Sequence, residues 1–344
     1  MSCFVIAEAG VNHNGSEELA LKLVDEASRA GADAVKFQTF RAESLVTPGA
    51  EKAEYQKANT QEGDQLSMLQ NLELSRQAHQ SLKEHCDASG IEFMSTPFDA
   101  EAVDFLVGLG IKRIKIPSGE LTNHPFIAHL AGKGLPVIMS TGMATLEEVI
   151  EAVEVVQTTR QCKRFPEPLE DRLTLLHCTS NYPTKTEDIN LNAMLTLKNE
   201  TGLPIGYSDH SEGILMAALA VGLGATVIEK HFTMDRKLPG PDHAASLEPD
   251  ELQQMIRNIR TAEEAMGSSV KAPTPSELPV RDAARRSITL TRNISRNETL
   301  SEKDLVLLRP GNGIPPKELS RVIGCKVKAD LPQGHTLKWS DLEA

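Results

Sequence analysis

Two histidines follow the last two of a series of short apolar runs. His210 comes shortly after Leu203–Gly206, and His231 comes shortly after Thr226–Ile228. Neighbouring strands of a sheet lie about 4.8 Å apart, so imidazoles at the ends of two such strands can reach one ion. Two histidines with open positions suit Mn²⁺, Fe²⁺ or Zn²⁺ acting as a Lewis acid. The competing interpretation is that one or both histidines only pack or hydrogen-bond within the fold.

Two lysines end other apolar runs, and hydroxyl side chains lie near them in the pattern. Lys36 follows Ala34–Val35, and Lys115 follows Ile114. An ammonium group at such a place is costly unless it meets an anion, and phosphate or carboxylate would suit. The hydroxyls expected beside them are Ser118, Ser140 and Ser208. Two alternatives stay open: the lysines pair with Glu8, Glu120 or Glu229 of the chain itself, or one of them forms a Schiff base with a carbonyl substrate.

Carboxylates and other hydrogen-bonding groups fall at the same positions of the pattern. The carboxylates are Glu8, Asp209, Glu229 and Asp242. Gln38 and Tyr182 are suited to hydrogen-bond a polyol. Taken together, these residue types predict a site that binds an anion and a polar carbon compound beside a metal.

The elements that must position these groups are eight strands. The apolar runs are Phe4–Ala7, Ala34–Val35, Glu92–Met94, Ile114, Val137–Met139, Leu173–Leu176, Leu203–Gly206 and Thr226–Ile228. Runs of this kind are typical of buried parallel strands, and helical patterns separate them. The clearest predicted helices are 17–30, 74–89, 146–157 and 248–266. Eight such units predict an α/β fold, a (β/α)8 TIM barrel, in which reactive groups lie at the carboxyl ends of the strands.

The domain organisation follows from changes in composition. Residues 1–270 are expected to form the catalytic barrel, and the proline-rich segment 271–285 is expected to be a linker. Residues 286–344 have short β-like pieces, and ETLSEKDL at 298–305 resembles HTLKWSDL at 335–342. This repeat predicts a small pseudo-twofold β domain. The polar stretch 41–71 is long for a βα connection and is either a lid over the site or a surface insertion.

Composition excludes several classes of protein. The 344 residues carry a formal net charge of −12, which does not favour a nucleic-acid partner. The five cysteines form no CxxC pair and are expected to be reduced, which indicates a cytoplasmic protein. No signal peptide and no apolar run of about 18 residues is recognisable, so no membrane association is expected.

Longer motifs occur in a specific order along nearly the whole chain. They are IAEAGVNHNG at 6–15, VKFQTF at 35–40, STPFD at 95–99, KIPSGE at 115–120, STGM at 140–143, YSDHS at 207–211, IEKHFT at 228–233 and PGPDH at 239–243. With them the chain resembles the sialic acid synthase family, whose members condense phosphoenolpyruvate with an N-acylated mannosamine-type sugar. The tail from Arg286, with RPGNG at 309–313, resembles the antifreeze-like (SAF) domain of that family, a β-clip fold.

The resemblance implies a role for each predicted site residue. His210 and His231 would bind Mn²⁺, with Mg²⁺ or Co²⁺ possible in its place, and Glu8 would act at the reacting centre. The residues implied to hold phosphoenolpyruvate are Lys36, Lys115, Ser118, Ser140 and Ser208. The residues implied around the acceptor sugar are Gln38, Tyr182 and Asp242. Glu120 and Ser180 complete the predicted substrate-binding set; Ser180 replaces an asparagine that some members use near the phosphate.

The resemblance also implies a partner subunit and two candidate acceptor sugars. Arg309 would reach the N-acyl group of the sugar from the partner subunit, which implies a domain-swapped homodimer. We expect N-acetylmannosamine as the acceptor, which would give N-acetylneuraminate; the alternative is a 2,4-diacetamido-2,4,6-trideoxyhexose, which would give legionaminate or pseudaminate. A pyruvate aldolase using a lysine Schiff base and a non-catalytic carbohydrate-binding protein are the alternatives outside this family.

Overall fold

The chain folds into two compact units, Met1–Gly267 and Ser268–Ala344. The computed structural model describes residues 2–60 and 63–343. The first unit contains a sheet of eight parallel strands, and the second contains a two-stranded antiparallel sheet. Among the described residues, no helix is both long and apolar enough to cross a membrane.

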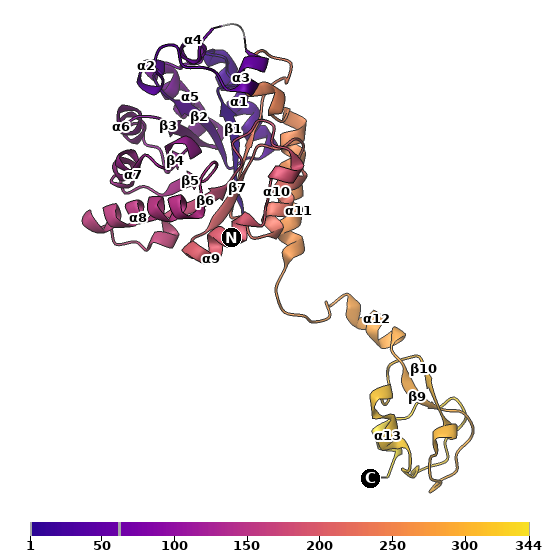
Figure 1. Ribbon diagram of the computed structural model, residues 1–344. Coiled ribbons are helices and arrows are strands. Elements are labelled where there is room, and N and C mark those ends of the chain that lie inside the picture. Colours follow the sequence, from indigo (N-terminus) through magenta and orange to yellow (C-terminus); the bar gives the residue numbers. More distant parts are fainter. Residues whose placement is uncertain (1, 61–62, 344) are drawn as a thin grey trace. The chain divides into compact units, whose positions relative to one another are not determined.

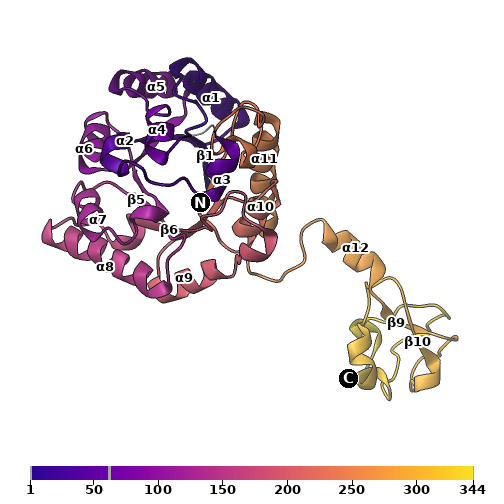
Figure 2. The ribbon, with the colours of Figure 1, turned by 45° about the horizontal axis from the view of Figure 1, so that its top comes forward.

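The first unit is a TIM barrel, as the eight apolar runs predict. Its strands are β1 Phe4–Gly10, β2 Ala34–Thr39, β3 Glu92–Pro97, β4 Ile114–Ile116, β5 Val137–Ser140, β6 Leu173–His177, β7 Ile205–Asp209 and β8 Val227–His231. Hydrogen bonds give the order β3-β2-β1-β8-β7-β6-β5-β4, and β3 also lies against β4, so the sheet closes on itself (Figure 2).

Helices form the outer ring around the strands (Figure 1). They are α1 Glu17–Ala30, α5 Arg76–Ser89, α6 Ala100–Gly108, α7 His124–Ala131, α8 Leu146–Cys162, α9 Ala193–Thr201, α10 Leu215–Gly222 and α11 Pro249–Met266. Local signals fix their ends: Ser16 accepts a hydrogen bond from the Leu19 N–H at the start of α1, and Gly31 takes a left-handed conformation (φ 86°) after its last residue. The four helices predicted from the sequence are all present, with ends shifted by five residues or fewer.

The interior of the barrel is built in layers by the two-residue period of the strands. One buried apolar layer consists of Ile6, Ala34, Met94, Ile138, Leu176 and Val227. Side chains two residues further along a strand point the same way. The next positions toward the carboxyl end are Glu8, Lys36, Thr96, Ser140, Cys178 and Glu229, all of them buried. The fold therefore places a polar layer directly above an apolar floor.

The segment after β2 carries three short helices and lies at the carboxyl end of the barrel (Figures 1 and 2). They are α2 Ala42–Leu45, α3 Glu54–Asn59 and α4 Gln65–Gln70. Met68 and Leu72 pack with Val11 and Phe40 in a small apolar cluster, which anchors the segment to the loops after β1 and β2. The segment is thus attached at the mouth of the barrel.

The second unit has its own core and two copies of one turn. It contains α12 Glu277–Ala284, β9 Ser287–Leu290, β10 Leu305–Leu308 and α13 Leu319–Val322, and its core includes Ile288, Leu300, Val327 and Leu337. In each copy of the repeat an aspartate accepts a backbone N–H three residues before it: Asp304 from Ser301 and Asp341 from Lys338. The repeated sequence therefore builds the same capped turn twice. Helix α12 lies within the segment 271–285 that the sequence predicts to be a linker.

Candidate active site

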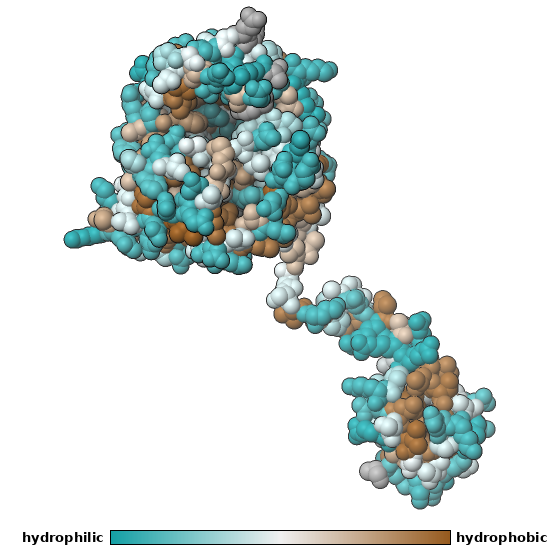
Figure 3. Space-filling model, viewed as in Figure 1, coloured by the Kyte–Doolittle hydropathy of each residue, from teal (hydrophilic) through white to brown (hydrophobic). Residues whose placement is uncertain are grey.

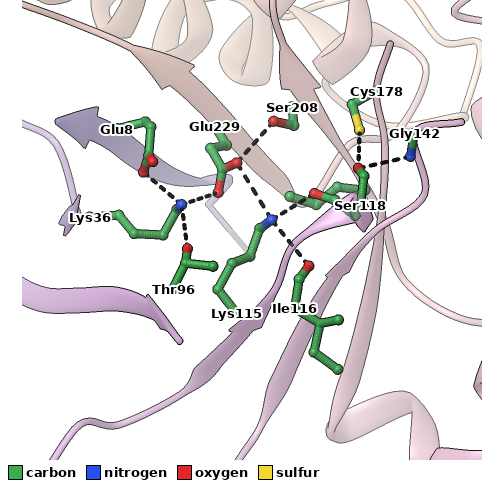
Figure 4. Close-up of polar contacts among 12 residues, drawn as sticks. Glu8, Lys36, Thr96, Lys115, Ile116, Ser118, Gly142, Cys178, Ser208 and Glu229 are labelled. Carbon is green, nitrogen blue, oxygen red and sulfur yellow. Dashed lines mark hydrogen bonds and ion pairs between the residues drawn. The ribbon is translucent and has the colours of Figure 1, made fainter. Parts of the chain in front are cut away.

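The centre of the barrel mouth holds two buried lysines and two buried glutamates. Lys36 Nζ lies 2.6 Å from Glu8 Oε2 and 3.6 Å from Glu229 Oε2. Lys115 Nζ lies 3.6 Å from Glu229 Oε1. Figure 4 shows the four side chains, which come from β1, β2, β4 and β8, pointing toward one another. The ion-pair alternative for the lysines therefore holds in this structure, with Glu8 and Glu229 as partners.

Burial and charge shift the protonation equilibria of this layer in opposite directions. Burial raises the pKa of Glu8 to about 7 although Lys36 opposes the shift. Burial would also raise the pKa of Glu229, but attraction by Lys115 and Lys36 prevails and lowers it to about 2. Burial disfavours the charge of Lys36, yet Glu229 and Glu8 raise its pKa, whereas burial lowers the pKa of Lys115. Glu8 is therefore the carboxyl group in this layer that exchanges a proton near neutral pH.

Hydroxyl groups surround Lys115 on the β4–β6 side of the mouth. Lys115 Nζ donates to Ser140 Oγ at 2.7 Å. Ser118 Oγ accepts the Gly142 N–H at 3.0 Å and lies 3.1 Å from Cys178 Sγ (Figure 4). A Cβ atom at Gly142 would lie 2.4 Å from Ser180 Oγ and 2.9 Å from Ser118 Oγ. Glycine at position 142 therefore lets these hydroxyls converge with a lysine, a group that suits phosphate oxygens.

The two histidines lie together on the β7–β8 side. Their ring centroids are 5.6 Å apart. His210 Nδ1 donates to the Thr179 carbonyl at 2.7 Å, so its Nε2 carries the lone pair, and Ser208 and Tyr182 hydroxyls lie 3.2 Å from it. Burial lowers the pKa of His210 to about 4 and that of His231 well below its usual value. Both rings are therefore neutral at neutral pH.

These features fit the predicted metal. Neutral imidazole is the form that binds metals, and the tautomer of His210 is set by its backbone partner. His231 Nδ1 is buried and has no hydrogen-bond partner among the described residues. The same residues contain no cluster of three His, Cys, Asp or Glu side chains arranged to hold an ion. Two histidine ligands would leave coordination positions for water and substrate oxygens on such an ion.

The predicted acceptor residues lie next to the histidines. Asp242 Oδ2 is 3.9 Å from His231 Nδ1, and burial raises the pKa of Asp242 to about 6. Gly10 ends β1 with φ 52°, and a Cβ atom there would lie 3.3 Å from Glu8 Oε1, 3.5 Å from His231 Cε1 and 3.6 Å from Gln38 Nε2. Side chains from β1, β2 and β8 thus converge on the open face of Gly10.

Glu120 and Arg309 were also predicted to belong to the site. The contacts that each makes within its own unit do not involve the residues of this cluster. Glu120, in the turn after β4, accepts a hydrogen bond from Asn123 at 2.7 Å on the partly exposed rim. Arg309 is exposed in the second unit. In the sequence pattern Glu229 is named as a carboxylate and as a lysine partner but has no role of its own, and Thr96, Gly142 and Gly10 are omitted from the predicted site. The position of Glu229 two residues before His231 on the same strand is the signal for its place in the buried layer.

Comparisons with known proteins agree with this arrangement. The model of the NeuB family matches residues 23–271, and that of the SAF domain matches residues 285–343. The chain is 54% identical to an N,N'-diacetyllegionaminic acid synthase of Legionella pneumophila over 100% of this chain and 96% of the relative. It is 45% identical to the synthase of that name from Campylobacter jejuni, over 93% and 94% of the two chains.

More distant relatives carry related names. The human N-acetylneuraminate-9-phosphate synthase is 32% identical over 97% of this chain and 91% of its own. A crystal structure of the N-acetylneuraminic acid synthetase of Leptospira borgpetersenii, in complex with citrate, superposes with a TM-score of 0.70 at 36% identity, covering 81% of this chain and 90% of that one. The chain belongs to the NeuB family of sialic acid synthases and carries the SAF domain at its C-terminal end.

Proposed function

We propose that this protein condenses phosphoenolpyruvate with an open-chain N-acylated hexosamine to give a nonulosonic acid and phosphate. The observation that carries the proposal is that two groups of side chains with different chemistry lie on different sides of one barrel mouth. Lys115, Ser140 and Ser118 form an anion-binding half on β4–β6. His231, Gln38 and Asp242 form a half suited to a metal and a polar sugar, on β8 and β2.

Charge balance in the buried layer supports an anionic substrate. With both glutamates ionised, the two lysines are neutralised and the layer has no excess positive charge. Because burial raises the pKa of Glu8 to about 7, this carboxyl can take up a proton as a phosphate ester arrives, which leaves the lysine charges for the ligand. The raised pKa of Lys36 favours an ammonium that binds an anion over a neutral amine that forms a Schiff base, whereas burial lowers the pKa of Lys115, so the argument applies to Lys36 alone.

We propose Mn²⁺ as the resident metal, with Mg²⁺ or Co²⁺ as alternatives, held by His210 and His231. When bound, the ion supplies Lewis acidity toward the carbonyl oxygen of the acceptor. Gln38 and Asp242 orient the open-chain sugar, and Tyr182 lies against the His210 ring at a centroid distance of 4.2 Å. These residues hold the aldehyde carbon close to C3 of the enol ester, which removes much of the entropic cost of bringing two molecules together.

Different residues then serve the different steps of the reaction. C3 of phosphoenolpyruvate forms a bond to the aldehyde carbon, and the aldehyde oxygen takes up a proton to become a hydroxyl. Water adds at C2 and gives up its protons, one to that oxygen and one to the departing phosphate, as the C2–O bond to phosphate breaks and a ketone remains at C2. Glu8, 2.6 Å from Lys36, holds or moves a proton beside C2. Lys36, Lys115 and the hydroxyls of Ser118, Ser140, Ser180 and Ser208 hold the phosphate through charge-assisted hydrogen bonds.

For the acceptor we propose a 2,4-diacetamido-2,4,6-trideoxyhexose, which makes the product a legionaminate. Two N,N'-diacetyllegionaminic acid synthases share 54% and 45% of their residues with this chain, against 32% for the human N-acetylneuraminate-9-phosphate synthase. N-acetylmannosamine, giving N-acetylneuraminate, is the second candidate. We also propose that Arg309 completes the site from a partner subunit in a domain-swapped homodimer.

Phosphate release tests the proposal directly. The metal-free protein is mixed with phosphoenolpyruvate, Mn²⁺ and each candidate sugar in turn. We expect release of phosphate that requires both Mn²⁺ and a sugar, and removal of the metal with EDTA should abolish it. A borohydride-trapped pyruvate adduct on Lys36 or Lys115, without sugar-dependent phosphate release, would instead favour an aldolase.

A further inference from the structure

A cavity is lined by loops that follow the strands of the sugar half of the mouth, and none of the roles above uses it. Its volume is about 320 Å³. Its walls come from three loops that follow β1, β2 and β8, represented by Asn14, Lys52 and Pro241. Those are the strands that carry Glu8, Gln38 and His231. The space-filling view shows a hollow in the barrel unit below the segment with α2, α3 and α4 (Figure 3).

The position of the cavity matches the direction in which the acceptor must extend. The phosphate hydroxyls Ser118, Ser140 and Ser180 belong to β4, β5 and β6 or their loops, on the other side of the barrel from β1. In the proposed condensation, the carbon chain of the product runs from that half past His231 and Asp242. Asp242 directly follows Pro241, which lines the cavity, so we take the far end of this chain to lie toward the cavity.

The walls are held in place by specific contacts. Asn59 donates its side-chain amide to the Pro241 carbonyl at 3.3 Å, and the Gly240 N–H donates to the Asn59 carbonyl at 3.3 Å. A Cβ atom at Gly240 would lie 2.6 Å from His243 Cδ2 and 2.9 Å from Asn14 Oδ1, and φ at this residue is 153°. Glycine at 240 thus lets the β8 loop approach the β1 loop closely at the edge of the cavity.

The lining combines polar and apolar side chains, and together these can bind an acetamido group. Lys52 Nζ donates to Thr60 Oγ1 at 3.0 Å, and its side chain is largely buried beside Asn71 and Ser67. Met68 and the prolines of the β8 loop supply apolar surface. An ammonium and amide groups can bind a carbonyl oxygen, while the apolar wall covers a methyl group. A hydroxyl would use neither the apolar wall nor most of the volume.

We infer that this cavity is the subsite for the second acylamino group of the acceptor sugar, so that it selects a diacylamino hexose over one with a hydroxyl at that carbon. The inference rests on the proposed condensation and adds the residues that decide which sugar is used. Filling or emptying such a pocket typically changes the ratio of kcat/KM for two competing substrates by about 10- to 200-fold.

Two variants of the full-length protein test the subsite. Ser67→Phe fills the cavity from the exposed start of α4, and Lys52→Met removes the donor while keeping the length of the side chain. The matched control is Gln70→Phe, which places the same ring on the same helix outside the cavity lining. Phosphate release is measured with the 2,4-diacetamido-2,4,6-trideoxyhexose and with N-acetylmannosamine, each against saturating phosphoenolpyruvate.

We expect both variants to lower the ratio of kcat/KM for the diacetamido sugar to that for N-acetylmannosamine by about tenfold or more, chiefly through KM. The KM for phosphoenolpyruvate and the ratio in Gln70→Phe should stay at wild-type values. An unchanged ratio in both variants, or a wild-type protein that uses only N-acetylmannosamine, overturns the subsite while the condensation stands. A wild-type protein that releases phosphate with neither sugar overturns the proposed function itself.

Discussion

Asp209 and Lys230 lie directly opposite each other on β7 and β8, and each immediately precedes one of the two neighbouring histidines. The Lys230 ammonium lies 3.0 Å from Asp209 Oδ2, and neither side chain is accessible to solvent. Asp209 Oδ1 also accepts the N–H and the hydroxyl of Ser211. Because side chains alternate along a strand, this ion pair lies on the opposite face of the sheet from His210 and His231 and fixes the register of their strands.

Breaking this pair should destabilise the barrel strongly. Lys230→Met leaves a buried carboxylate without its counter-charge, a loss that typically costs about 3–5 kcal/mol, and urea denaturation measures it. The double variant Asp209→Leu with Lys230→Met should recover part of that loss because no unpaired charge remains. Lys22→Met, which breaks an exposed pair with Glu18, serves as the control and should change the free energy of unfolding by at most about 1 kcal/mol. Equal effects of Lys22→Met and Lys230→Met would contradict this account.

His210→Ala should remove Mn²⁺ binding without unfolding the protein. In the proposed metal site the ring would supply a neutral nitrogen to the ion, while its Nδ1 donates to the Thr179 carbonyl. Isothermal titration calorimetry measures binding, and circular dichroism checks the fold. His177→Ala is the comparison, since His177 hydrogen-bonds the Ile189 carbonyl and should leave Mn²⁺ affinity unchanged. Loss of the fold in His210→Ala with metal affinity retained would assign this histidine to packing.

Gly142→Ala should weaken phosphoenolpyruvate binding. The new methyl group would lie 2.4 Å from Ser180 Oγ and 2.9 Å from Ser118 Oγ, so the hydroxyls must move away from the position at which we propose they hold phosphate. We expect the KM for phosphoenolpyruvate to rise about tenfold or more, in steady-state kinetics at a fixed sugar concentration. Gly108→Ala is the control because nothing lies within 4 Å of its Cβ position. A KM that stays at its wild-type value in Gly142→Ala would exclude these hydroxyls from phosphate binding.

Acid should destabilise the second unit through Asp304. Hydrogen bonds from the Ser301 hydroxyl and N–H, aided by Arg292, lower the pKa of Asp304 to about 2 from an ordinary 3.8. The stabilisation from this carboxylate is complete above about pH 4 and is lost as the pH falls toward 2. The only tryptophan of the chain, Trp339, lies in this unit and packs against Arg321, so its fluorescence reports unfolding there. Asp304→Asn should flatten the pH dependence of stability between 4 and 2, and an unaltered profile would show that Asp304 does not contribute.

The sequence by itself determined the barrel and the depth at which most site residues lie. The period of two along each strand places Glu8 two residues above Ile6 and Lys36 two residues above Ala34, and helix caps such as Ser16 and Gly31 are local signals. The spacing of the histidines relative to the last two strands likewise requires only that neighbouring strands pair. These features depend on short stretches of chain, so a single sequence contains them.

Only the tertiary structure decided which groups meet. Lys36 pairs with Glu8 and Glu229, whereas Glu120 bonds to Asn123 at the rim; this choice depends on closure of the barrel, which brings β1 beside β8. The need for glycine at 142 depends on Ser118 and Ser180, which lie on different strand ends. The sequence left the segment 41–71 as either a lid or an insertion, and its place over the β8–β1–β2 side follows from the packing of Met68 against Val11 and from the contact of Asn59 with Pro241. Each of these contacts joins residues far apart in the chain, and no local pattern encodes them.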